Sequence, residues 1–248
     1  MFHVDDIEPL ANRPRRALSI LFSHELLDAT WSVFEGGEQG AAPHVHRRHV
    51  DAFYVVDGEL TFRIGPSLGP VKAGPGTFVA VPPGVVHAFD NEGDSVASWF
   101  NFHGPSTGFA AYLRGEQEGF DSFDPPKDGG LDAALVVIAT ADSAETHGSD
   151  EHRLTLLGEH PLISTVLIDA ASGVAAPPFS MSGEVDGFFV LAGEVELTLG
   201  DQVLTGGPGT WMVAAPGESH ALRNAGDGPA SILNVRAPDA GFVETLRR

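Results

Sequence analysis

The sequence has no cysteine. This absence excludes disulfide bonds, thiolate metal ligands and a cysteine nucleophile. It also agrees with a reducing compartment, and the segment Met1–Arg16 has no apolar core of the length that a signal peptide needs. We therefore expect a cytoplasmic protein.

Basic residues are scarce. The chain has 14 Lys and Arg residues against 34 Asp and Glu residues, which gives a formal net charge of -20 at pH 7. A charge of this sign repels a phosphate backbone, so nucleic acid is not an expected partner. The acidic residues are better explained as a solvated surface than as a binding cleft. Runs of about 20 apolar residues, which a membrane-spanning helix requires, are also missing, so we expect no membrane partner.

Glycine and proline, by contrast, are frequent. The 248 residues include 30 Gly and 18 Pro, which divide the hydrophobic residues into short runs such as the alternating Leu60–Ile64. This pattern predicts many short strands joined by tight turns. The length suits two domains, and the segment Asp121–Gly130, rich in Pro, Gly and Asp, is the natural boundary. We expect an N-terminal domain over residues 1–120, and a linker with a C-terminal domain over residues 121–248.

The two halves of the sequence repeat one pattern at a nearly constant spacing. Matched pairs 135 residues apart are Asp51 with Asp186 and Gly58 with Gly193. After a deletion of two residues, pairs 133 apart are Gly76 with Gly209, Gly84 with Gly217, His87 with His220, Asn91 with Asn224, Asn101 with Asn234, and Pro105 with Pro238. A short helical pattern after Pro105 recurs after Pro238. We therefore predict an internal duplication of an all-β unit, with each copy followed by a short helix.

Three histidines and one aspartate have the spacing of a metal site. His44 and His46 are two residues apart, so on a strand their rings project from the same face. Asp51 begins the next strand, and His87 comes from a separate hairpin. In a closed barrel all four side chains can point inward. Three imidazoles and a carboxylate suit Fe, Mn, Ni, Co or Zn as divalent ions, and an octahedral ion would keep about two positions open.

The alternative interpretation is that these histidines gather by chance at the rim of a barrel. We favour the metal site because the His-x-His pair, the nearby carboxylate and a His behind a Pro-x-Gly turn occur together. His49 lies in the turn between His46 and Asp51. For this residue we favour a solvated rim position over an additional ligand.

These residues resemble the two sequence motifs of the cupin superfamily. The first motif is matched at His44, His46 and Gly58, and the second at Gly76, Pro82, Gly84, His87 and Asn91. There are two departures from the family pattern. Asp51 replaces the usual Glu, and the leading glycine of the first motif is displaced, with Gly37 and Gly40 flanking its expected place. The resemblance implies two tandem cupin barrels of the jelly-roll type, related by internal duplication and each followed by a short helix.

The pattern is most similar to that of quercetin dioxygenase-like cupins. This resemblance implies an oxidoreductase with one divalent transition metal per chain, a dioxygenase acting on a small oxygen-bearing substrate that is flavonol-like or enolic. It further implies that Asp51, at the place of the family's Glu, is both a ligand and the catalytic acid or base. Two alternatives remain open: a cupin isomerase, decarboxylase or hydrolase using the same site, and a non-catalytic cupin that binds a small molecule or a metal.

The second copy has lost part of the predicted site. The positions of His44 and His46 are taken by Phe179 and Met181, which are apolar residues that fill a barrel and do not hold a divalent ion. Asp186 and His220 remain and are expected to form an internal hydrogen-bonded pair. We therefore expect the metal in the N-terminal barrel only, and a C-terminal barrel that is structural or binds an apolar ligand.

Aromatic side chains surround the first copy's motifs, and most are expected to form its core. Phe53 and Phe89 share strand faces with Asp51 and His87, so they are the candidate substrate-binding residues. Two fused barrels imitate the dimer of single-barrel proteins. The oligomeric expectation is therefore either a monomer with internal pseudo-symmetry or a homodimer.

Overall fold

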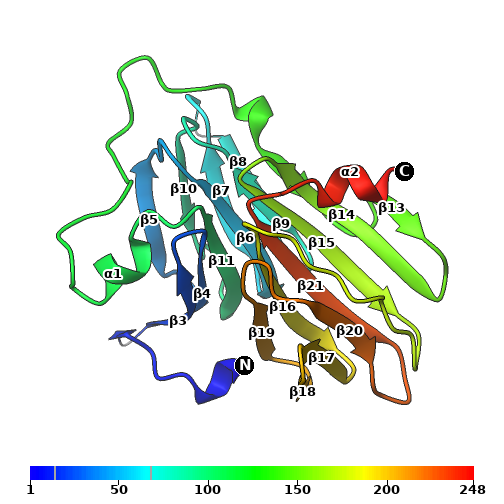
Figure 1. The fold of residues 1–248 in the computed structure, drawn as a ribbon. Helices are drawn as coiled ribbons and strands as arrows, with labels where there is room; N and C mark the ends of the chain where they lie inside the picture. Colours follow the sequence, from blue (N-terminus) through cyan, green and yellow to red (C-terminus); the bar gives the residue numbers. More distant parts are fainter. Residues whose placement is uncertain (14, 68) are drawn as a thin grey trace. The chain divides into compact units, whose positions relative to one another are not determined.

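The computed structural model describes residues 1–13, 15–67 and 69–248, and these residues form two compact units (Figure 1). One unit spans Glu8–Thr140, and the other combines Met1–Ile7 with Ala141–Arg248. The structure confirms the predicted all-β class, because strands dominate both units and the helices are short.

In its described residues, the unit Glu8–Thr140, here called the N-terminal barrel, carries two sheets and two short helical segments. Its strands are β2 (Ala11–Arg13), β3 (Arg16–His24), β4 (Leu27–Phe34), β5 (Gln39–His44), β6 (Val50–Asp57), β7 (Leu60–Ile64), β8 (Gly69–Ala73), β9 (Phe78–Val81), β10 (His87–Asp90), β11 (Ala97–Gly104) and β12 (Val137–Ala139). Its helical segments are α1 (Phe109–Leu113) and the 3-10 turn η2 (Ala133–Leu135). The strands form one sheet in the order β12-β9-β6-β11-β4-β3-β2 and a smaller one in the order β5-β10-β7-β8.

The core of this barrel lies between its two sheets. Alternation along each strand directs every second side chain inward. Phe53 on β6 and Trp99 on β11 therefore meet Phe62 on the facing strand β7 in one buried cluster. The smaller sheet ends at His44 and His87, and these two residues are paired across β5 and β10. Two of the predicted ligands, His44 and His87, are thus brought together where β5 ends and β10 begins.

The second unit, here called the C-terminal barrel, repeats this arrangement. Its strands are β1 (Phe2–His3), β13 (Glu145–Gly148), β14 (His152–His160), β15 (Ile163–Ala170), β16 (Val185–Ala192), β17 (Val195–Leu199), β18 (Gln202–Gly206), β19 (Thr210–Ala214), β20 (His220–Asn224) and β21 (Ala230–Ala237). Its helical segments are the 3-10 turn η1 (Val4–Asp6) and α2 (Phe242–Leu246). The sheets run β1-β19-β16-β21-β15-β14-β13 and β18-β17-β20. Just after α2, Arg247 binds Glu145 on β13 and Glu159 on β14.

The limits of the two units differ from residues 1–120 and 121–248 in two segments. The strand β12 follows the Pro- and Gly-rich segment but pairs with β9 in the N-terminal barrel. The strand β1 pairs with β19 in the C-terminal barrel. Both differences arise from backbone pairing between segments far apart in sequence, which composition does not reveal.

Across the described parts of the chain, none of the helices has both the length and the apolar character needed to cross a bilayer.

Candidate metal centre

Three strands and the turn between two of them position the predicted ligands. His44 ends β5 and His87 begins β10, so their pairing places the two rings side by side with centroids 4.2 Å apart. His46 follows in the turn, whose backbone is held by the bridge between Val45 and Phe123. Asp51 lies on β6 in the facing sheet. The barrel therefore brings all four side chains together between its two sheets.

The ligand atoms of this group lie close together. One atom from each of His44, His46, Asp51 and His87 falls within 4.8 Å of every other. His46 Nε2 lies 3.2 Å from His44 Nε2 and 3.3 Å from Asp51 Oδ2, and His87 Nε2 lies 3.1 Å from the same carboxylate oxygen. Two donors that each lie about 2.1 Å from one ion and subtend about 90 to 110 degrees at it are about 3.0 to 3.4 Å apart. The observed separations fit that requirement.

The outward nitrogen of each imidazole is already held by the backbone. His44 Nδ1 donates to the carbonyl of Ala42 at 2.8 Å, and His87 Nδ1 donates to that of Val85 at 3.2 Å. His46 Nδ1 is hydrogen-bonded to the carbonyl of Asp121. Each bond fixes the tautomer with the proton on Nδ1, which leaves Nε2 as the atom that can bind a metal.

Burial and mutual proximity set the charges of the cluster. Burial, together with the neighbouring His87 and His46, lowers the pKa of His44 to about 4, so this ring is neutral at pH 7. Burial alone would raise the pKa of Asp51, but its contacts with His103, His46 and His87 hold that pKa well below the usual range. Burial likewise opposes charge on His46, yet the hydrogen bond to Asp51 raises its pKa. A divalent ion bound by the four side chains would take the place of any proton on these Nε2 atoms.

The second oxygen of Asp51 is fixed by two residues of β11. Asn101 Nδ2 donates to Asp51 Oδ1 and also to the carbonyl of Ala52 at 3.2 Å. His103 Nε2 lies 3.2 Å from the same Asp51 oxygen. Register explains the arrangement, because His103 pairs directly with Asp51 across β11 and β6. Asp51 is therefore presented with Oδ2 toward the three histidines and Oδ1 toward β11.

The comparisons with known proteins agree with this architecture. The sequence profile of the cupin domain matches residues 30–103 and again residues 166–236. The chain belongs to the cupin family. Because it carries two such domains, it is a bicupin. None of the curated protein sequences matches it at a significant level.

Solved structures with a similar fold include other two-domain proteins. The oxalate decarboxylase of Bacillus subtilis has 12% sequence identity and a TM-score of 0.70, with 96% of this chain and 76% of that chain covered. AerE from Microcystis aeruginosa has 14% identity and a TM-score of 0.65, with coverage of 93% and 96%. At these identities the similarity establishes the fold of the bicupin and not its reaction.

The expectation that His49 is a solvated rim residue is wrong. Its side chain is 0% exposed, and its Nδ1 lies 3.0 Å from the carboxylate of Asp121. The same carboxylate oxygen accepts the backbone N–H groups of Arg47 at 3.0 Å and Arg48 at 2.7 Å. A buried anion under the turn thus draws His49 inward. The motif spacing contains no signal for this contact, because Asp121 comes from a segment that reads as a linker.

A cavity of about 100 Å³ opens beside the candidate ligands. Phe89 lines it together with His44, His46, Asp51, Asn101 and His103, while further apolar walls come from Leu18, Phe34, Ala41, Trp99, Phe109 and Phe120. Phe53 is not among the lining residues. It is 0% exposed and lies behind Phe89 with ring centroids 5.1 Å apart. Of the two substrate-binding candidates, the structure places Phe89 at the cavity and Phe53 in the core.

His103 and Asn101 are contacts of the candidate site that the motifs did not reveal. Both lie on β11, where alternation places Trp99, Asn101 and His103 on one face. That alternation, ending in a histidine, is the sequence signal that could have marked them. His103 also packs against His49 with ring centroids 4.5 Å apart.

The C-terminal barrel confirms the register of the duplication. Phe179 pairs with His220 as His44 pairs with His87, and Gly217 donates to the carbonyl of Met181 as Gly84 does to that of His46. The predicted pair of Asp186 and His220 is present, with Oδ2 and Nε2 2.9 Å apart. The two histidine positions are therefore truly replaced by Phe179 and Met181.

Proposed function

We propose that the bicupin is a metal-dependent enzyme whose N-terminal barrel oxidises a small enolic substrate with dioxygen. The observation that carries this proposal is the convergence of three Nε2 atoms and one carboxylate oxygen, with the outer atoms of all four side chains already hydrogen-bonded within the protein. Because these side chains are already fixed before binding, they lose little conformational entropy when they bind a divalent ion.

His44, His46, Asp51 and His87 would hold this ion. A bound transition metal supplies a Lewis acid and, when it is redox-active, the electrons for chemistry with dioxygen. The ligand set suits Fe, Mn, Ni, Co or Zn. Manganese has additional support, because the similarly folded oxalate decarboxylase of Bacillus subtilis has Mn(II) centres.

Asp51 and His103 would handle the substrate proton. The Asp51 carboxylate is buried and lines the cavity, where it can accept a hydrogen bond from a substrate hydroxyl. His103 lines the cavity and lies 3.2 Å from Asp51 Oδ1. A substrate hydroxyl at the cavity can therefore lose its proton to this pair, while Asn101 holds the carboxylate in place.

The cavity supports a small substrate with little charge. Its volume of about 100 Å³ is below the roughly 300 Å³ at which typical ligand pockets begin, so a flavonol is disfavoured against a compact enol. The lining residues include no Lys or Arg. A divalent ion beside the Asp51 carboxylate leaves about one positive charge, which a singly charged enolate balances. Aromatic walls would keep water from the reacting atoms.

Decarboxylation is the second candidate. It is favoured by the fold of oxalate decarboxylase, which extends over 96% of this chain, and by the small cavity. The lack of a cationic lining side chain opposes a dianionic acid as substrate. The two candidates differ in consumption of dioxygen, because only the first uses it in proportion to product.

The test is to remove metal from the protein with a chelator and then to load it with Fe, Mn or Ni. Dioxygen uptake and CO2 release are then followed with small enols and small carboxylic acids. We expect about one ion per chain and metal-dependent dioxygen uptake with an enol. His87→Ala should abolish both ion binding and turnover, whereas His220→Ala, the matched change in the C-terminal barrel, should preserve them. Turnover that persists in His87→Ala and His44→Ala would reject the metal enzyme. Stoichiometric ion binding without turnover on any substrate would favour a non-catalytic cupin.

A further inference from the structure

The C-terminal barrel carries a buried arginine where the N-terminal barrel carries His103. Arg236 and His103 are 133 residues apart, which is the spacing of the duplication in this region. Arg236 Nη2 lies 2.7 Å from Asp186 Oδ2, and Arg236 Nη1 lies 2.7 Å from Glu184 Oε1. Glu184 is the counterpart of His49. The neighbouring histidines of the first barrel thus correspond to an ion pair in the second.

This guanidinium supplies the positive charge that Asp186 needs. The Arg236 side chain is 6% exposed, and its plane lies over the ring of Phe242 at 3.7 Å and near that of Phe179 at 4.7 Å. Because Arg236 already neutralises these carboxylates and two imidazole ligands are replaced, we expect no metal ion to bind here. The barrel has exchanged an ion site for an internal cation.

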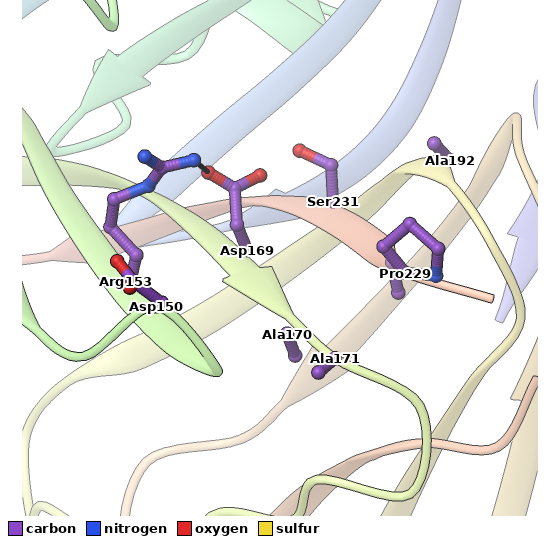
Figure 2. A pocket seen from close by; sticks show the side chains of 9 residues that line it. Asp150, Arg153, Asp169, Ala170, Ala171, Ala192, Pro229 and Ser231 are labelled. Carbon is purple, nitrogen blue, oxygen red and sulfur yellow. Dashed lines mark ion pairs between the residues drawn. The ribbon is translucent and has the colours of Figure 1, made fainter.

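A cavity of about 200 Å³ opens beside Arg236 and His220. It is twice the size of the cavity in the N-terminal barrel, and its remaining walls are mainly apolar, with Leu154, Ile168 and Phe188 among them. Another hollow of the same barrel, shown in Figure 2, differs in character. There Arg153 and Asp169 form an ion pair at 3.4 Å beside small residues such as Ala171. Among the described residues that line this hollow, none of the polar ones is buried.

We infer that the cavity beside Arg236 binds a small uncharged organic molecule with an apolar body and one hydrogen-bond acceptor, such as an aryl ketone. This site is distinct from the metal centre and goes beyond the proposed reaction. Its apolar walls would take the body of the ligand. Arg236 would take the acceptor, because Nε, Nη1 and Nη2 each have one protein partner and each terminal nitrogen retains a further N–H group.

The charges around the cavity argue for a neutral ligand. Arg236 faces two carboxylates, those of Glu184 and Asp186, and His220 is the remaining titratable group in contact with them. Arg236 is thus matched by two carboxylates, and two histidines, His220 and His152, also line the cavity. A carboxylate ligand would add a buried negative charge beside Glu184 and Asp186, which already pair with Arg236. A cationic ligand would be repelled by the positive charge of Arg236, which offers only hydrogen-bond donors.

The test uses nuclear magnetic resonance of methionine methyl groups in the full chain. The three methionines are Met1, Met181 and Met212, all in the unit that contains the C-terminal barrel. Met212 belongs to the core cluster that also includes Phe188 and Leu222 of the cavity wall. Acetophenone is titrated against benzoate and benzylamine. We expect acetophenone to shift the Met212 methyl signal with a Kd of about 1 mM or tighter, at least about tenfold tighter than either charged probe.

A matched pair of variants locates the binding. Ala176 and Ala41 occupy equivalent positions, 135 residues apart, and each lines the cavity of its own barrel. Ala176→Trp should weaken acetophenone binding at least about tenfold, and Ala41→Trp should leave it unchanged. If Ala176→Trp does not fold, Ala221→Phe fills the same cavity from β20. The proposal is overturned if no probe shifts Met212, if benzoate binds more tightly than acetophenone, or if filling the cavity leaves binding intact.

Discussion

Replacement of Asp121 by alanine should weaken both the N-terminal barrel and its hold on a metal ion. The carboxylate is buried beneath the turn that carries His46 and accepts two backbone N–H groups and the ring of His49. Asp121→Ala removes these three acceptor contacts together. The backbone carbonyl that holds His46 remains, so the loss falls on the shape of the turn and not directly on the ligand.

The size of the effect follows from which donors water can reach. A hydrogen bond to a charged group contributes about 1.5 to 3 kcal/mol, so three such bonds set an upper bound of about 5 to 9 kcal/mol. Arg47 and Arg48 are exposed residues whose N–H groups can rehydrate, whereas His49 is fully buried. We therefore expect a loss of about 3 to 4 kcal/mol in the free energy of unfolding. The metal Kd should rise about 10- to 100-fold, as for other outer contacts of ligands.

Urea denaturation and hydrogen exchange together provide the assay. In Asp121→Ala the amides of Arg47 and Arg48 should exchange faster, and metal titration should give the weaker Kd. Asp124→Ala, an exposed change in the same segment, is the control and should stay within about 0.5 kcal/mol of the wild type. Equal stability of the two variants, with unchanged protection of the turn, would refute the role assigned to Asp121.

Three further predictions concern the two barrels separately. Chelation of the metal should lower the free energy of unfolding of the N-terminal barrel only, by about 2.7 kcal/mol relative to a free ion concentration 100 times Kd, and should lower its melting temperature with it. Calorimetry that shows both barrels affected would contradict a single site. Asn101→Ala should raise the metal Kd about 10- to 100-fold because Asp51 loses a donor, whereas Asn234→Ala, its counterpart beside Asp186, should not change metal binding in isothermal titration. Burial opposes a charge on His220, but the hydrogen bond to Asp186 raises the pKa of His220 in the folded chain. The stabilisation from this hydrogen bond is therefore complete below the unfolded pKa of about 6.5. It is lost as the pH rises through the folded pKa. The advantage of wild type over His220→Gln in urea denaturation should therefore shrink above pH 6.5, and a constant difference would reject this coupling.

The four proposed ligands could be predicted because they depend on short-range pattern. The spacing of His44 and His46 predicted rings on one side of the chain, although β5 ends at His44 and His46 lies in the turn that follows. His87 follows a Pro-x-Gly turn that fixes its place at the start of β10. The duplication could be predicted for a similar reason. A constant spacing of glycine and asparagine preserves the same turns, and Asn91 and Asn224 indeed bond equivalent carbonyls beside their turns.

The supporting residues could not be predicted because their contacts are distant in sequence. Asp121 lies more than 70 residues from the turn that it anchors. His49 was expected at the surface since nothing near it in the sequence requires burial. Arg236 is the clearest case, because a lone arginine near the end of a strand is usually exposed. Its role becomes visible only once Glu184 and Asp186 are seen around it.

The pairing of β1 with β19 has a consequence for synthesis on the ribosome. Phe2 lies opposite Trp211, so β1 leaves the ribosome about 200 residues before the strand with which it pairs. At about 5 to 20 residues per second this is a delay of about 10 to 40 s. The N-terminal barrel, which ends at Thr140, can complete its sheets within that interval. The N-terminal barrel with its candidate metal centre would therefore fold before the C-terminal barrel, which can add β1 to its sheet only after β19 has been made.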